Sequence, residues 1–206
     1  MAVDTPKTAS TKEKILLAAS WLFSQRGFEA TSVRDICLEA GVNNALVNYH
    51  FGDKRSLYRA VIERELANSQ WTAPPPPDLA PVEKLRWIVE HSLEDVFRRD
   101  HFTRSSNREL LDPSEELMAL LQGPLERHFN ALLEVLRALS DDRLGEDELR
   151  LTALGISAQV QFHLFAPKFI PHLIGPDMAE RVDVRLLADH ITRSTLTILG
   201  HESTAG

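Results

Sequence analysis

The sequence has very little cysteine: Cys37 is the only one among its 206 residues. A single thiol excludes a disulfide framework and a cysteine-rich zinc site. The first ten residues are polar and lack the apolar run of a signal peptide, and no segment approaches the roughly 20 consecutive apolar residues of a membrane span. These absences predict a soluble protein of the reducing cytoplasm, with no membrane partner.

Patterns for catalysis and metal binding are also missing. The nine glycines stand mostly near expected helix ends and form no phosphate-cradling loop, and neither G-x-S-x-G nor H-E-x-x-H occurs. The eight histidines are spread along the chain without an H-x-x-x-H pair. We therefore expect no metal ion, no cofactor and no enzymatic activity.

Positive charge is scarce for a protein that might bind nucleic acid, with 23 Lys and Arg against 30 Asp and Glu and a net charge of −7. Residues 1–70 hold nine basic and eight acidic side chains (+1), and the rest of the chain holds 14 and 22 (−8). This asymmetry is compatible with a DNA-binding head on an acidic body, although +1 is not the basic patch that identifies a DNA binder unaided.

Apolar residues recur at helical spacing throughout, and no strand alternation is seen, so the sequence predicts an all-α fold. Gly123-Pro124 predicts a kink or break, and three prolines between 166 and 176 predict an irregular connection. The proline run at 73–81 cannot be helical. Helices are expected at 11–25, within 31–51 as two short helices, and at 53–68, 82–100, 102–111, 114–139, 146–165 and 182–199.

The proline run divides the chain. We expect a head of residues 1–70, whose first ten residues form a flexible arm, then a linker of residues 71–81 and a helical body of residues 82–206. The fourth expected helix, at 53–68, would join the head to the body.

The stretch Thr31–Phe51 has the spacing of a helix-turn-helix. Four apolar residues occupy the i, i+3, i+4 and i+7 positions of one helical face: Val33, Ile36, Cys37 and Ala40. Gly41 follows where a helix should end in the left-handed conformation that only glycine adopts without steric cost. Asn43 or Asn44 can cap the next helix, and Val47 turns inward. The second helix of such a motif lies in the DNA major groove.

The outward residues of this motif are candidates for DNA contacts. The groove-facing set is Asn43, Asn44, Ala45, Leu46, Asn48 and Tyr49, and the phosphate-facing set is Thr31, Ser32, Tyr49, His50 and Lys54. An asparagine can bond an adenine edge through both its oxygen and its nitrogen, and Ala45 or Leu46 can meet a thymine methyl group. Lys54 would stand in the first turn of a helix, where a cation opposes the helix dipole and a nearby phosphate would favour it. Asn43 and Asn44 can equally be helix caps.

The head resembles the TetR family of bacterial transcriptional regulators. The residues that carry the likeness are I-L-L-A-A-S-W-L-F-S-Q-R-G-F-E-A-T-S-V-R-D-I-C-L-E-A-G-V (15–42) and N-Y-H-F-G-D-K-R-S-L-Y (48–58). The body, with R-E-L-L-D-P-S (108–114) and H-L-I-G (172–175), is similar to the CecR (YbiH) branch. Cys37 replaces a usual alanine, and Asn48 replaces a tyrosine that contacts phosphate in many relatives.

The resemblance implies a homodimer whose C-terminal helices form the interface and a pocket for a small-molecule effector. Large or polar-tipped side chains on apolar helices are candidates to line that pocket, or else are core residues: Trp87, His91, Phe102, Arg108, Phe129, Phe162 and His163. Residues 151–165 carry no charge, which is typical of a buried interface or of an internal helix. The expected dimer contacts are Gly155, Ile156, Gln159, Phe162, Ile191 and Leu196.

The sequence therefore predicts a homodimeric, ligand-released repressor that binds a near-palindromic double-stranded operator. The alternative is a helical protein-interaction or small-molecule-carrier module without DNA binding, which the low charge of the head and Asn48 favour. Salt dependence separates the two hypotheses, because phosphate contacts make DNA affinity fall with ionic strength.

Overall fold

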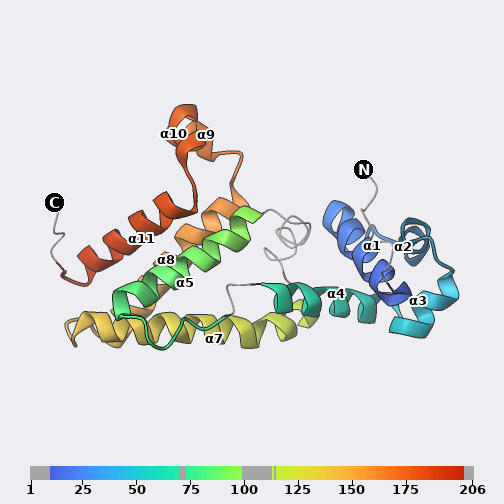
Figure 1. The fold of residues 1–206 in the computed structure, drawn as a ribbon, viewed down its shortest axis with the longest axis horizontal. Coiled ribbons are helices and arrows are strands. Elements are labelled where there is room, and N and C mark those ends of the chain that lie inside the picture. The colour runs from blue at the N-terminus through green and yellow to red at the C-terminus, as the bar shows by residue number, and fades with distance from the viewer. Residues whose placement is uncertain (1–9, 70–72, 99–112, 114, 202–206) are drawn as a thin grey trace. The chain divides into compact units, whose positions relative to one another are not determined.

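The structure is a computed structural model that describes residues 10–69, 73–98, 113 and 115–201. All regular secondary structure within these ranges is helical (Figure 1), which confirms the all-α class. The helices are α1 (Thr11–Arg26), α2 (Val33–Ala40), α3 (Asn44–Phe51), α4 (Lys54–Asn68), α5 (Pro81–Arg98), α7 (Glu115–Ser140), α8 (Glu146–Phe165), α9 (Ile170–Ile174), α10 (Pro176–Arg181) and α11 (Val184–Ile198). The helix expected at 102–111 lies outside the described residues. None of the described helices is long and apolar enough to cross a membrane.

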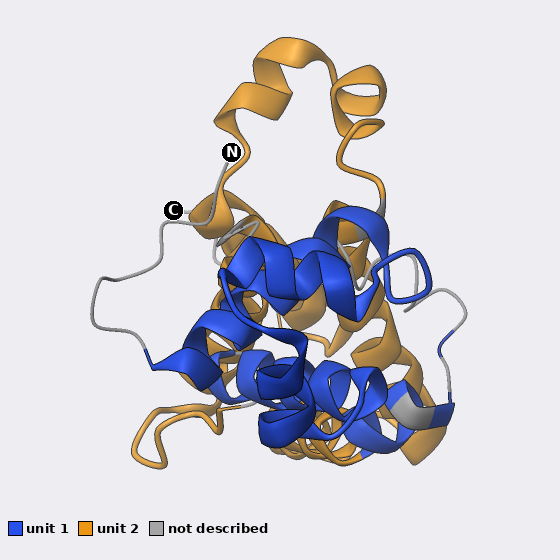
Figure 2. Ribbon diagram, turned by 90° about the vertical axis from the view of Figure 1, so that its right-hand side faces the viewer, with its two compact units in different colours: residues 1–69, 99–122 blue, residues 70–98, 123–206 orange. Residues whose placement is uncertain are grey.

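The chain forms two compact units, one of residues 1–69 and 99–122 (unit 1) and one of residues 70–98 and 123–206 (unit 2), as Figure 2 shows. Unit 1 contains more than the head expected from the sequence, because the first two turns of α7 belong to it. Leu117 and Leu121 of α7 are buried in the same core as α1–α4. An apolar stripe shows that a helix is covered, but it does not show which helices cover it.

The core of unit 1 joins α1 to the other head helices. Its buried side chains include Ile15, Leu22, Phe23, Ile36, Cys37, Val47, Leu57 and Ile62. The rings of Phe23 and Tyr58 meet edge to face at 5.1 Å, and Phe28 lies 4.9 Å from Tyr58. Such ring pairs stabilise a core beyond the area that they bury, and they hold α4 against α1.

The turn between α2 and α3 has the predicted geometry. Gly41 has φ 65° and ψ 36°, in the left-handed region. The N–H of Val42 donates to the oxygen of Cys37 at 3.0 Å, and the N–H of Gly41 donates to the oxygen of Leu38 at 3.3 Å. These bonds satisfy carbonyl groups that the end of α2 would otherwise leave open. The prediction that Gly41 ends the first helix of the motif is confirmed.

Unit 2 is a helical bundle of α5, the rest of α7, α8 and α11. Its core includes Leu85, Leu93, Leu132, Leu136, Ala153 and Ile191. Arg86 of α5 pairs with Asp189 of α11 at 2.7 Å, and Arg137 of α7 pairs with Glu146 of α8 at 2.7 Å. These pairs are exposed, so they add little to stability, and the apolar core holds the bundle together.

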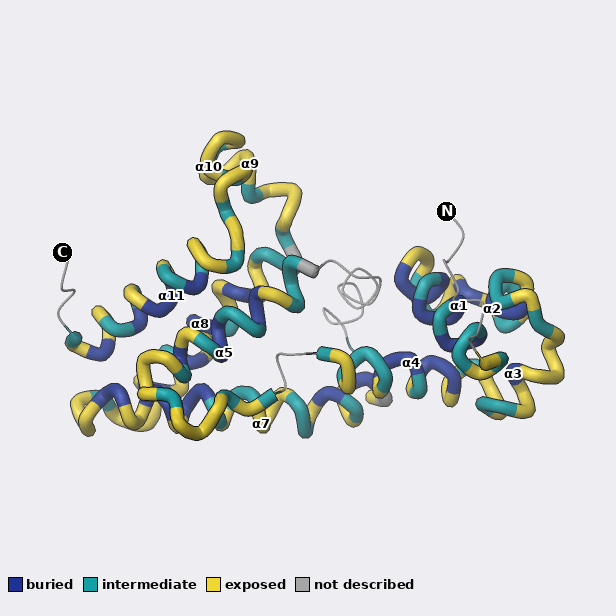
Figure 3. Tube along the Cα trace, in the orientation of Figure 1, coloured by how far each residue is buried: buried dark blue, intermediate teal, exposed yellow. Residues whose placement is uncertain are grey.

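Two predictions about irregular segments are corrected. α7 continues through Gly123-Pro124 without a break. A proline removes one backbone N–H, and α7 tolerates that loss, so the expected break is absent, while the alternative of a kink stays a prediction. The stretch 166–176, expected to be irregular, contains α9 and the first residue of α10, and each of these helices has a proline in its first turn, where the missing N–H costs no helical hydrogen bond. Figure 3 shows both helices largely exposed, and neither has a buried residue.

Candidate nucleic-acid interface

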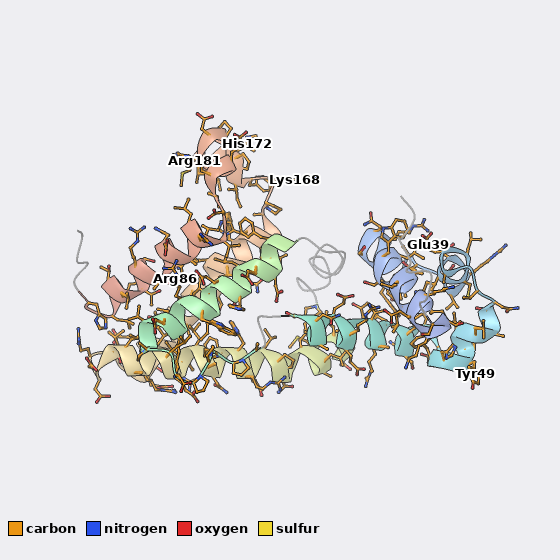
Figure 4. The ribbon with its side chains drawn as sticks, viewed as in Figure 1. Glu39, Tyr49, Arg86, Lys168, His172 and Arg181 are labelled. Atoms are coloured by element: carbon orange, nitrogen blue, oxygen red, sulfur yellow. The ribbon has the colours of Figure 1, made fainter. Side chains whose placement is uncertain are left out.

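The helix α3 presents a short surface without Lys, Arg, Asp or Glu. Val47 is fully buried and fixes the inner side of the helix. The groove-facing residues expected from the sequence are all exposed: Asn43, Asn44, Ala45, Leu46, Asn48 and Tyr49. Tyr49 is 81% exposed and points away from the head in Figure 4. The outward face can therefore offer amide groups, a methyl group, a leucine and a phenol to a ligand.

The two asparagines at the start of α3 have different partners within the head. The side-chain oxygen of Asn43 accepts a hydrogen bond from the N–H of Ala45 at 3.0 Å, so Asn43 is the helix cap. The side-chain oxygen of Asn44 accepts a hydrogen bond from the thiol of Cys37 at 3.6 Å. Asn44 thus connects α3 to α2.

Thr31 does not belong to the surface, which corrects its predicted phosphate contact. Its side chain is 1% exposed, and its hydroxyl donates to the oxygens of Gly27 at 2.8 Å and Leu22 at 3.3 Å. The short loop between α1 and α2 turns this hydroxyl inward, where it satisfies carbonyl groups at the end of α1. A threonine before a helix looks like a cap in the sequence, but Ser32 takes that role.

Ser32 is exposed, but its polar groups are already engaged by Asp35. The Ser32 hydroxyl accepts from the Asp35 N–H at 3.1 Å and donates to the Asp35 carboxylate at 2.6 Å, and the Ser32 N–H donates to the same carboxylate at 3.1 Å. The hydrogen bonds from the Ser32 side chain and backbone lower the pKa of Asp35. A phosphate at this helix terminus would meet an ionised carboxylate, so the structure does not favour the phosphate contact expected of Ser32.

The cation expected to contact phosphate lies close to the head surface. The ammonium of Lys54 lies 4.2 Å from the ring centroid of Phe28, within range of a cation–π interaction, and donates to the oxygen of Glu29 at 3.5 Å. The neighbouring Asp53 caps α4 by accepting from the N–H of Ser56 at 2.7 Å. His50, half-buried, lies between the rings of its two neighbours, with the Tyr49 centroid 5.1 Å away.

Among the described residues expected to line an effector pocket, two aromatic–histidine contacts are seen at different places along α5. Trp87 stacks on His91 with the ring centroids 3.8 Å apart, and the ring of His163 lies 6.1 Å from that of Phe97. Ten residues of α5 separate Trp87 from Phe97, about 15 Å along the helix. Phe129 is half-buried against the core of unit 2, and Phe162 is 45% exposed. Phe102 and Arg108 lie outside the described residues.

The expected dimer contacts differ in their burial, and two of them, Ile156 and Ile191, are corrected. Ile156 and Ile191 are 4% and 1% exposed and belong to the core of unit 2, and Leu196 packs against that core. Gly155, Gln159 and Phe162 are exposed. Residues one apart on an α-helix point about 100° apart, so Ile156 faces inward where Gly155 faces outward. Leu151 and Leu154 were not among the expected contacts, and they are 67% and 57% exposed. Helical spacing groups them with Gly155, but it does not show which side of the helix faces outward.

Among the residues that the structure describes, no three His, Cys, Asp or Glu side chains gather as a metal site would require. The arrangement of unit 1 is that of a helix-turn-helix, with a first helix that buries Ile36 and Cys37, a left-handed glycine turn and a second helix whose outward face is exposed. A head of this kind on a helical body defines a DNA-binding regulator.

Comparison with known proteins finds transcriptional regulators that match both parts of the chain. Residues 15–61 match the bacterial regulatory proteins of the tetR family, and residues 81–200 match the C-terminal domain of the HTH-type transcriptional dual regulator CecR. An HTH-type transcriptional repressor of Mycobacterium tuberculosis (strain ATCC 25618 / H37Rv) is 30% identical over 92% of this chain and 97% of its own length. The regulator AcrR of Shigella flexneri is 36% identical over 47% of this chain and 46% of its own.

Solved structures show the same fold. A TetR-like transcriptional regulator from Rhodococcus sp. RHA1 superposes with a TM-score of 0.73 at 20% identity, over 96% of this chain and 100% of its own. AibR in complex with isovaleryl coenzyme A and operator DNA superposes with a TM-score of 0.66 at 21% identity, over 90% of this chain and 97% of its own. The chain belongs to the TetR family of bacterial transcriptional regulators and carries a C-terminal domain of the CecR type. It is a regulator and not an enzyme.

The capping carboxylates predict how the stability of the head depends on pH. Hydrogen bonds from the backbone and side chain of Ser56 lower the pKa of Asp53. A carboxylate with a lowered folded pKa stabilises the fold above its unfolded pKa, and this contribution is lost as the pH falls through the folded pKa. Asp53→Asn keeps an oxygen for the cap but cannot titrate, so the free energy of unfolding should depend less on pH below about pH 4. Urea unfolding followed by circular dichroism at several pH values measures this.

The matched control for this prediction is Asp78→Asn, which changes an exposed aspartate of unit 2 and should leave the pH dependence of the parent protein. Equal pH dependence in the parent and in Asp53→Asn would contradict the assignment.

Proposed function

We propose that the protein is a homodimeric repressor that binds a near-palindromic operator through α3 of each subunit and is released by a small molecule. We place this action in the cytoplasm, where bacterial operator DNA lies. The observation that carries the DNA-binding part is the exposed face of α3, held by the buried Val47 and by the cap at Asn43. A short helix whose backbone is fixed in this way presents its side chains to base edges in a defined register.

Phosphate contacts would come from cations beside α3 and not from α3 itself. Lys54 begins α4, and its ammonium lies 4.2 Å from the ring centroid of Phe28. Lys12 of α1 is exposed, and its ammonium lies 5.8 Å from the ring centroid of Phe51 at the end of α3. Both cations belong to the head core helices, so they would set the register of α3 on DNA without reading sequence.

Substitutions at the two kinds of contact should have different effects on DNA binding. Lys54→Ala should weaken binding to all sequences similarly and reduce the slope of log affinity against log salt by about one. Asn44→Ala should weaken specific binding by roughly tenfold, relax preference at one base pair of each half-site, and leave the salt slope unchanged. The measurement is a gel-shift titration at several salt concentrations with duplexes selected from a random pool.

Lys84→Ala, in α5 of unit 2, is the control and should bind as the parent does. Parent protein that enriches no sequence from the pool, or that binds DNA without dependence on salt, would contradict the proposal and favour the protein-interaction or carrier module.

The dimer is proposed to form through the outward face of α8. Helical spacing places five exposed residues without charge on that face: Leu151, Leu154, Gly155, Ala158 and Phe162. The opposite face buries Leu149, Ala153, Ile156 and Val160 in the core of unit 2. A helix that is apolar on both sides is covered on both sides in its functional state, and Gly155 and Ala158 allow a partner helix to approach closely. The second copy of the chain is the proposed cover.

A charge on this face should prevent dimerisation. Leu154→Glu would place a carboxylate in an apolar contact, where an unpaired charge is strongly unfavourable, so the dimer dissociation constant should rise at least tenfold. Leu38→Glu is the matched control because Leu38 is 84% exposed on α2 in unit 1. Sedimentation velocity over a concentration series reports the oligomeric state. A dimer that survives Leu154→Glu but not Leu38→Glu would overturn the assignment.

The effector response is proposed to reside in unit 2. Two aromatic–histidine pairs support this, Trp87 with His91 on α5 and Phe97 of α5 with His163 of α8. These half-buried rings combine apolar surface with a titratable nitrogen, which suits an amphipathic small molecule. The structurally similar AibR was solved with isovaleryl coenzyme A and operator DNA, so acyl thioesters belong in the first set of compounds to test.

Two histidine variants should identify which pair takes part in the response. The compound panel is acyl-coenzyme A thioesters and small aromatic acids, read out as release of bound DNA and as a shift in melting temperature. If the Trp87 pair forms the site, His91→Ala should raise the effector concentration for half-release by roughly tenfold, while His163→Ala leaves it unchanged. If only His163→Ala raises that concentration, the pair of Phe97 and His163 forms the site. Equal responses in both variants would place the effector elsewhere.

A further inference from the structure

The amide groups at the start of α3 are oriented by the head before any DNA is bound. The oxygen of Asn43 is turned towards the N–H of Ala45 at 3.0 Å. The oxygen of Asn44 is turned towards the thiol of Cys37 at 3.6 Å. A carboxamide is planar, with its oxygen and its nitrogen about 120° apart on one carbon. When the oxygen faces the protein, the NH₂ group is the part left for a ligand.

The thiol is suited to hold this orientation because it remains a hydrogen-bond donor. Cys37 is 6% exposed in the core of unit 1, and burial raises the pKa of its thiol. A thiolate would have no proton to donate and would repel the amide oxygen, whereas the neutral S–H donates to it. An alanine at this position would have no hydrogen-bond donor and would leave the carboxamide of Asn44 free to rotate.

We propose that the Cys37 thiol is a positioning group that makes Asn44 a pure hydrogen-bond donor, so that the head selects guanine at the base pair which Asn44 contacts. This inference rests on the proposed DNA-binding function. It differs from the expectation that an asparagine reads adenine with both its oxygen and its nitrogen, because that mode requires both atoms on the outward edge.

The groups displayed in the major groove explain the choice of base. Guanine offers two neighbouring acceptors, N7 and O6, to an NH₂ group. Adenine offers one acceptor beside a donor, and cytosine offers a donor that would face the amide donor. Thymine offers one acceptor beside a methyl group. Because Asn43 is also oriented with its oxygen towards the helix, the start of α3 presents two donor groups and no outward acceptor.

The test compares base preference in the parent protein and in three variants, Asn44→Ala, Cys37→Ser and Cys37→Ala, by selection from a random duplex pool and sequencing. Asn44→Ala identifies the contacted base pair as the one whose preference is lost. The parent and Cys37→Ser, which keeps a donor, should select guanine there. Cys37→Ala should lower the preference for guanine over adenine by roughly fivefold, as expected for the loss of one hydrogen bond.

A chemical probe tests the same contact on the DNA. Replacing that guanine by 7-deazaguanine removes the N7 acceptor, so the affinity of the parent protein should fall by roughly fivefold and that of Asn44→Ala should not change. Melting curves of the three variants serve as the folding control. A loss of stability would weaken binding to every sequence and would leave the preferred base at the contacted base pair unchanged. A change in that preferred base therefore indicates that Cys37 orients the Asn44 amide.

The outcomes separate the two levels of the proposal. Selection of adenine by the parent, or an unchanged guanine preference in Cys37→Ala, would overturn the positioning role while leaving DNA binding intact. Enrichment of no sequence by the parent would instead overturn the proposed function.

Discussion

The position of α3 depends on one small buried contact region. α3 is eight residues long, too short to be stable as an isolated helix in water, and Val47 is its one fully buried side chain. Its place is determined by that side chain, by the cap at Asn43 and by the turn at Gly41. If any of these were lost, the outward residues would have no defined direction, and a surface that reads base edges depends on direction.

Because α3 is held by so few contacts, polar side chains near it form hydrogen bonds within the protein. Thr31, Ser32 and Asn43 satisfy backbone groups at helix ends in the two short connections α1–α2 and α2–α3. Fewer residues then remain to contact DNA than the sequence indicates. The proposed contacts that remain are the NH₂ group of Asn44, the amide of Asn48, the phenol of Tyr49 and the exposed Ala45 and Leu46, with cations proposed from α1 and α4.

Unit 2 shows how a helix can serve two surfaces. α8 buries one apolar face in its own bundle and exposes another that carries no charge. An uncharged segment such as 151–165 is compatible with an internal helix and with an interface. The structure shows that one side of α8 is internal, and the exposed side is the proposed interface. The effector candidates are less concentrated, because the two aromatic–histidine pairs are separated along α5.

Much of the fold could be predicted because helical periodicity, glycine turns and proline runs act locally. The helix-turn-helix, its glycine at 41 and the helical class follow from residues that are neighbours in the chain. Local patterns could not show that Leu117 and Leu121 join the core of unit 1, or that Ile156 faces inward while Leu154 does not. Those facts depend on which distant helices pack together.

By itself the sequence determined the helix-turn-helix and the set of residues on the outer side of α3, because periodicity and capping are encoded within a few residues. It indicated the family through the resemblance of residues 15–42 and 48–58 to known regulators. Only the tertiary structure decided that the oxygen of Asn44 faces Cys37, that Thr31 is buried, and that one side of α8 remains uncovered. Side-chain orientation is set by packing between helices that lie far apart in sequence, and a linear pattern does not record it.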